Sequence, residues 1–145
     1  MRIDRLTNPL QMALSDAQSL ALVRDHSQLD TLHLLSAMLD QQGGTVRALL
    51  AQAGFKVNGL RNELAKQLSN LPKVQHTTGD VQLSPEMGRL LNLSDKKSQK
   101  TGDKFISSET VLLAAMEDGT TALGKLLSSY GETVSYTHLT LPTIA

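Results

Sequence analysis

The sequence predicts an all-α fold, an eight-helix-type bundle of two pseudo-twofold four-helix repeats. The segment from Leu6 to Gly54 aligns without a gap on the segment from Leu83 to Gly131, at an offset of 77 residues, and the apolar positions agree. Within each segment, leucine and alanine recur every three or four residues, which is the period of an α-helix. The last helix that this symmetry demands has no counterpart in the sequence, and we expect it to be lost or replaced by a non-native tail.

These patterns divide the chain into four parts. Repeat one covers residues 1–72, a linker without helical periodicity covers residues 73–82, and repeat two covers residues 83–133. Residues 134–145 are rich in threonine and contain Pro142, so we expect a non-native tail there and exclude it from the fold.

The first helix of each repeat has a recognisable start. Thr7 can accept a hydrogen bond from an exposed backbone N–H, and Pro9 is tolerated in the first turn. Ser84 and Pro85 open the second repeat in the same way. The apolar stripes that should face the core are Leu10, Ala13, Leu14, Ala17, Leu20 and Ala21 in repeat one, and Met87, Leu90, Leu91 and Ser94 in repeat two.

The second helix of each repeat should be buried, because residues 32–39 and 111–116 are almost wholly apolar. Asp30 or Thr31 caps the first of these helices, and Ser107 or Ser108, with Glu109, caps the second. Short third helices should then end at Gly54 and Gly131, which serve as left-handed caps. A fourth helix spans residues 55–71 and is stopped by Pro72.

The composition excludes several classes of function. The chain has 145 residues, with 14 basic and 14 acidic side chains, so no net charge attracts nucleic acid or anionic lipid. It has no cysteine for a disulfide, a thiolate metal site or a nucleophile. The first residues do not form a signal peptide, and no apolar run is long enough for a membrane span. We therefore expect a soluble cytoplasmic protein.

The sequence also offers no catalytic signature. No phosphate-binding loop occurs, and the four histidines, His26, His33, His76 and His138, lack the spacing of a metal site. His33 starts a buried helix and is expected to be a structural, hydrogen-bonded histidine. We expect neither a metal nor a cofactor, and no enzymatic activity. An enzyme would require a deep pocket that brings His33 or His76 towards a carboxylate.

One residue lies outside the regular pattern. Leu93 is off the apolar stripe of its helix, at the position where repeat one has Asp16. It is either a lone exposed leucine, as on most proteins, or the border of a groove beside the second buried helix.

Several short segments of the sequence resemble one protein family. They include residues 1–7, Leu32-His-Leu-Leu-Ser-Ala37, Leu71-Pro-Lys-Val74 and residues 102–109. Over residues 1 to about 133 the chain is similar to the N-terminal domain of ClpB-type bacterial disaggregases, within the Clp family of ring ATPases.

The resemblance implies an eight-helix domain tethered to a hexameric ring that threads aggregated polypeptides using ATP. It implies a groove in the second repeat that engages apolar segments, with Thr7, Asp103 and Glu109 at polar positions important to that role. Lys97 and Thr110 stand where relatives have apolar residues near the groove. A groove with both should bind apolar segments more weakly or, through the lysine, favour acidic ones.

We therefore expect a non-catalytic, monomeric module that recruits unfolded or aggregated polypeptides. The alternative is a docking module for a folded adaptor protein. The residues expected to bind substrate are Thr7, Leu93, Lys97, Asp103, Glu109 and Thr110.

Overall fold

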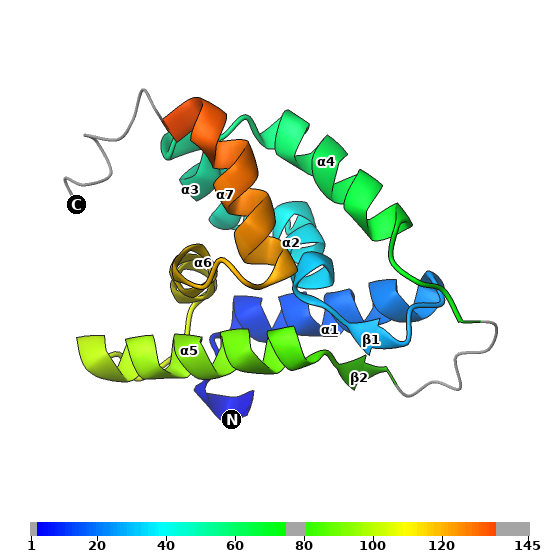
Figure 1. Cartoon of the computed structure of the whole chain (residues 1–145). Helices are drawn as coiled ribbons and strands as arrows, with labels where there is room; N and C mark the ends of the chain where they lie inside the picture. The colour runs from blue at the N-terminus through cyan, green and yellow to red at the C-terminus, as the bar shows by residue number, and fades with distance from the viewer. Residues whose placement is uncertain (1–2, 75–80, 136–145) are drawn as a thin grey trace.

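The computed structural model describes residues 3–74 and 81–135, and it confirms the all-α class (Figure 1). The described residues hold seven α-helices, one short 3-10 helix and two strands of two residues each. The elements are the 3-10 helix Ile3–Arg5, α1 Asn8–Val23, β1 Gln28–Leu29, α2 Thr31–Asp40, α3 Val46–Gln52, α4 Val57–Ser69, β2 Gln82–Leu83, α5 Pro85–Thr101, α6 Ser108–Glu117 and α7 Ala122–Ser135. Among these helices, none combines the length and the apolar character that a membrane crossing needs. Residues 75–80 of the expected linker and 136–145 of the expected tail lie outside the described residues.

The helix starts follow the capping residues expected from the sequence. The Thr7 side chain accepts a hydrogen bond from the Leu10 N–H at 3.4 Å, and Ser84 accepts from Met87 at 3.0 Å. Of the alternatives for α2 and α6, Asp30 and Ser107 are the caps. These bonds satisfy backbone donors that the first turn of a helix leaves free.

The two halves of the chain correspond through the same offset of 77 residues. Helix α2 spans residues 31–40, and α6 spans residues 108–117. Two parallel strand contacts are also related by this offset. Leu6 pairs with Ile106, and their equivalents Leu83 and Leu29 pair with each other. The Thr7 N–H bonds to the Ile106 carbonyl, and the equivalent Ser84 N–H bonds to the Leu29 carbonyl, both at 3.0 Å.

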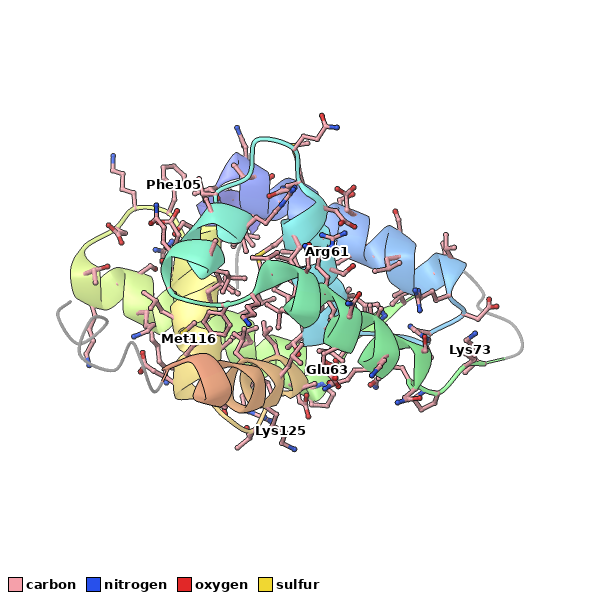
Figure 2. All side chains as sticks on the ribbon, turned by 90° about the horizontal axis from the view of Figure 1, so that it is seen from above. Arg61, Glu63, Lys73, Phe105, Met116 and Lys125 are labelled. Carbon is pink, nitrogen blue, oxygen red and sulfur yellow. The ribbon has the colours of Figure 1, made fainter. Side chains whose placement is uncertain are left out.

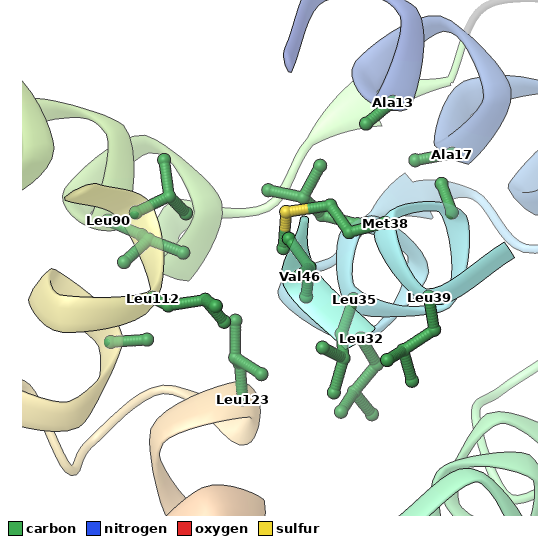
Figure 3. Close-up of a cluster of buried hydrophobic side chains, with 14 of the residues drawn as sticks. Ala13, Ala17, Leu32, Leu35, Met38, Leu39, Val46, Leu90, Leu112 and Leu123 are labelled. Carbon is green, nitrogen blue, oxygen red and sulfur yellow. The ribbon is translucent and has the colours of Figure 1, made fainter. Parts of the chain in front are cut away.

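A single apolar core joins both halves, with α2 near its centre. Ala13 and Ala17 of α1 face α2, where their small side chains allow the two helices to approach closely (Figure 3). The same cluster continues through Met38 to Leu112 of α6 and Leu123 of α7. Because the core is continuous, each half covers apolar surface of the other.

Two expectations for the second repeat are wrong. Helix α6 is not buried all round, because Leu113 and Met116 expose 56% and 40% of their surface. Gly131 is not a cap, because α7 continues through it to Ser135. In repeat one the expected cap is confirmed: Gly54 has φ +97°, a left-handed conformation that glycine adopts without strain. The equivalent glycine in α7 sits inside a longer helix, so equivalent sequence did not give an equivalent end.

Candidate functional site

The most open apolar surface of the second repeat lies on the outer face of α6. Glu109, Leu113 and Met116 follow one another at helical spacings of four and three, so their side chains share a face. Phe105, 52% exposed, precedes the helix. Figure 2 shows Phe105 and Met116 towards the two ends of α6. The face therefore carries apolar side chains along its length, with acidic groups beside them.

Helix α5 borders this face through Leu93 and Lys97. Leu93 is half-buried and packs against the core, so it is less exposed than a free surface leucine. The Lys97 ammonium forms an ion pair with the Glu117 carboxylate of α6, and the lysine side chain is 28% exposed. This bridge crosses from α5 to α6. It places a charged pair where the family resemblance implies apolar contacts.

The side chains of Thr110 and Glu109 lie on different sides of α6. Thr110 belongs to the start of the helix, where its backbone N–H donates to the Ser107 hydroxyl at 3.2 Å and its own hydroxyl lies 3.1 Å from the same atom. The Glu109 carboxylate accepts from the Thr45 hydroxyl at 3.4 Å, at the beginning of α3. Glu109 therefore connects the outer face of α6 to the first repeat.

Thr7 and Asp103 position the segment that leads into α6. The Thr7 N–H bonds to the Ile106 carbonyl, and the Ile106 N–H bonds to the Arg5 carbonyl at 2.7 Å. The Arg5 guanidinium reaches the Asp103 carbonyl at 3.4 Å and forms an ion pair with Asp95 of α5 at 2.6 Å. The Asp103 carboxylate accepts from the Thr101 hydroxyl at 2.8 Å. The hydrogen bonds of Thr7 and Asp103 therefore hold the segment before α6 in place.

The structure thus divides the six predicted residues into two groups. Leu93, Lys97, Glu109 and Thr110 lie on or beside α5 and α6, whereas Thr7 and Asp103 belong to the supporting segment. Sequence reasoning missed Leu113 and Met116 because their helix is almost wholly apolar. A signal was present for Leu113: its equivalent in repeat one is Ser36, a polar residue that marks an outward position.

Two cavities among the described residues lie elsewhere. One of about 610 Å³ is lined by residues from the end of α2, α3 and the start of α4, including Arg47, Ala48 and Phe55. Another, of about 350 Å³, lies between α1 and α2. None of the six predicted residues lines either cavity, so volume alone does not point to the outer face of α6.

Two of the four histidines, His26 and His33, are in contact. His26 Nδ1 and His33 Nε2 are 2.8 Å apart, and both side chains are buried. The Asp30 N–H donates to His33 Nδ1 at 2.9 Å, so neutral His33 carries its proton on Nε2 and donates it to His26. Burial, followed by the neighbouring His26, lowers the pKa of His33 to about 4. This confirms the expected structural role of His33, and the described side chains gather no cluster of three or more metal-ligating groups.

The fold and the open face define a small all-α repeat domain that presents apolar side chains on one helix. Comparison with known proteins gives a specific result. Residues 5–130 match the family described as the Clp repeat (R) N-terminal domain. The chain belongs to this family.

Named relatives agree with that assignment. Over 131 residues, 90% of this chain, it is 57% identical to the chaperone protein ClpB of Pseudomonas putida. It is 51% identical to the ClpB of Vibrio cholerae over 133 residues, 92% of this chain. The chain spans about 15% of the length of each of these relatives.

Solved structures share the fold. A complex of a ClpV N-domain with a VipB peptide has a TM-score of 0.77 and 28% identity, and covers 94% of this chain and 83% of that one. The N-terminal domain of Hsp104 from Candida albicans has a TM-score of 0.76 at 22% identity, and covers 87% of this chain and 81% of that one.

Proposed function

We propose that this chain is the non-catalytic, substrate-recruiting module of a ClpB-type disaggregase, and that it binds exposed apolar segments of unfolded or aggregated polypeptides. The exposure of Leu113 and Met116 on the outer face of α6 carries the proposal. A segment bound there would be passed to a hexameric ATPase ring on the same protein, in the cytoplasm. The solved ClpV N-domain complex supports the idea, because that relative is bound to a peptide.

The proposal includes the expected organisation of the module. It is an eight-helix-type domain of two pseudo-twofold repeats, residues 1–72 and 83–133, and a monomer when isolated. The two repeats are supported by α2 and α6, which begin and end at residues that lie 77 positions apart.

The expected affinity is low. Burying Leu113 and Met116 contributes about 1.5 to 3 kcal/mol each, against an association cost of at least about 4 kcal/mol. These two contacts alone leave a net gain of at most about 2 kcal/mol, so a single module should bind weakly, with a dissociation constant in the millimolar range or above. Six modules around a ring would compensate through effective concentration, while each contact remains easy to release for threading.

Titration of the isotopically labelled domain with a permanently unfolded protein, reduced and carboxymethylated, tests the proposal. Chemical-shift changes should cluster at Leu93, Glu109, Leu113 and Met116. Leu113→Gln should raise the dissociation constant about tenfold, because the loss of one buried apolar side chain costs on the order of 1.4 kcal/mol of binding free energy. Met12→Gln is the matched control, because Met12 is 63% exposed on α1 and lies outside the site. Equal effects of the two variants, or evenly scattered shifts, would contradict the proposed site.

The alternative, a docking surface for a folded adaptor, predicts different behaviour. A folded partner should bury at least about 1,000 Å² and bind with defined stoichiometry. Recruitment of unfolded chains should instead be promiscuous. Competition between two unrelated unfolded proteins for the module therefore separates the two functions: mutual displacement supports client recruitment, and its absence supports an adaptor.

The ion pair between Lys97 and Glu117 gives a second test. Lys97→Leu together with Thr110→Leu removes the bridge and adds apolar side chains to α5 and α6. We expect the double variant to bind the unfolded protein several-fold more tightly. Unchanged affinity, with an unchanged fold by circular dichroism, would place the binding site away from the border between α5 and α6.

A further inference from the structure

The first repeat contains a groove at the position that corresponds to the proposed site in the second. The cavity of about 350 Å³ lies between α1 and α2, and its lining includes Asp16, Leu20, Val23, Ala37 and Asp40. Under the 77-residue offset, Asp16 corresponds to Leu93, Leu20 to Lys97 and Asp40 to Glu117. The two surfaces are therefore equivalent in the fold and differ in their side chains.

The difference opens the groove of repeat one. In repeat two, Lys97 bridges to Glu117 across the two helices. In repeat one the equivalent of the lysine is Leu20, which cannot form that bridge. Asp40 instead pairs with Arg61 of α4, at 2.5 Å. The space between α1 and α2 stays open, and its volume falls within the range of about 300–1,000 Å³ typical of ligand sites.

The lining combines an apolar floor with an acidic rim. Leu20 is half-buried, Ala37 is buried, and Val23 is 79% exposed beside them. The rim carries Asp16 and Asp40, of which Asp40 is already paired with Arg61, and none of the described residues that line the cavity is a lysine or an arginine. Asp16 is exposed and forms no ion pair or side-chain hydrogen bond with the described part of the chain. Its charge is therefore available to an incoming group.

We propose that the α1–α2 groove is a second polypeptide-binding site, and that it selects extended segments in which an aliphatic side chain is next to lysine or arginine. The aliphatic side chain packs on Leu20 and Ala37, and the neighbouring cation lies against Asp16. This choice of occupant follows from charge complementarity, because an acidic segment would meet the unpaired carboxylate of Asp16. The inference goes beyond the proposed function, since it concerns the other repeat and uses none of the residues of α5 or α6.

Two short unstructured peptides test the site. They are identical except for a central Leu-Lys-Leu in one and Leu-Glu-Leu in the other. Titrated into the labelled chain, the lysine peptide should shift the amide signals of Leu20, Val23 and Ala37 and bind at least several-fold more tightly than the glutamate peptide. Because an exposed ion pair is modest, Asp16→Asn should reduce this preference by about two- to fivefold. Asp16 is exposed and unpaired, so the variant should fold normally.

Variants of the second repeat separate this site from the proposed function. In Leu113→Gln the lysine peptide should still shift the signals of α1 and α2. If it shifts only signals of α6, or if the two peptides bind the α1–α2 groove equally, the inference is overturned. Added salt should also weaken binding of the lysine peptide, because the Debye length falls from about 10 Å at 0.1 M to about 3 Å at 1 M. Affinity that does not change with salt would contradict the role of Asp16.

Discussion

Thr7 has two functions within one residue, which makes its substitution informative. Its side chain caps α1, and its backbone N–H bonds to Ile106 in the segment before α6. Only the first of these bonds depends on the side chain. A loss of client binding in a Thr7 variant can therefore arise through stability rather than contact.

We expect Thr7→Ala to lower the free energy of unfolding by about 0.5 to 2 kcal/mol, the usual cost of a lost N-cap. Urea denaturation measures this change. Thr7→Ser keeps the capping oxygen and is the matched control, with near-native stability. Unchanged stability of the alanine variant together with lost client binding would instead make Thr7 a contact residue.

The buried histidine pair makes stability depend on pH. His33 has a pKa of about 4 in the folded chain, against 6.5 for a free histidine. Between these values the unfolded chain binds more protons than the folded chain, so protonation favours unfolding. Stability should therefore be full above pH 6.5 and should fall by up to about 3 kcal/mol as the pH drops towards 4.

Denaturation series from pH 7 to pH 4.5 check this dependence. His33→Gln removes the titrating group, and its amide oxygen can still accept the Asp30 N–H as in a capping box. The variant should show a flatter profile, which separates the histidine from carboxylates that titrate near pH 4. Parallel profiles for the two proteins would show that His33 contributes nothing to the pH dependence.

At the scale of elements, the tight packing at the start of α7 depends on one glycine. A Cβ atom at Gly124 would lie 2.2 Å from the Asp118 carbonyl oxygen and 2.6 Å from that of Ala115. Both are backbone atoms, so α6 and the turn after it would have to move. Only glycine fits this approach of α7 to the end of α6.

We therefore predict that Gly124→Ala destabilises the chain by about 1 to 3 kcal/mol or more. Gly88→Ala is the matched control, because Gly88 lies within α5 and a Cβ there meets nothing within 4 Å. That variant should gain about 0.4 to 1 kcal/mol, since alanine restricts the unfolded chain. Thermal unfolding of the two variants should shift in opposite directions, and equal shifts would contradict the packing at Gly124.

The sequence predicted helix starts better than exposed faces. Starts depend on local chemistry, and the caps Thr7, Ser84, Asp30 and Ser107 are visible in the sequence. Exposure depends on which neighbour covers a helix. The outer face of α6 was expected to be buried because its residues are apolar, yet no element in the described part of the chain covers Leu113 and Met116 fully. The contact between His26 and His33 was also missed, because it depends on how the chain turns between α1 and α2.

At the scale of the whole molecule, the sequence predicted the class of fold and the family. Periodicity and the internal alignment indicated the class of fold, since they depend on the pattern of many residues, whereas the resemblance of several short segments indicated the family. The exact arrangement of the site was not predictable. The ion pair of Lys97 with Glu117 and the bond of Glu109 to Thr45 join residues that are distant in sequence, and only packing brings them together.

The continuous core predicts that neither half folds alone. Fragments of residues 1–74 and 75–145 would each expose apolar surface that the other now covers, including Leu35, Leu112 and Leu123. Separately, each fragment should give poorly dispersed amide spectra and no cooperative melting. Mixed in equal amounts, they should recover a folded spectrum. A cooperative transition in either isolated fragment would show that the repeats are independent domains.

The reciprocal strand contacts of Leu6 with Ile106 and of Leu83 with Leu29 have a consequence for the origin of the chain. A polypeptide with only one copy of the unit would find the acceptor for its leading segment on a second molecule, and would be complete only as a symmetric homodimer. Fusion of two copies would turn that association into an internal one. In such a fused chain a substitution in one copy no longer alters both, so position 20 can hold a leucine while the equivalent position 97 holds a lysine.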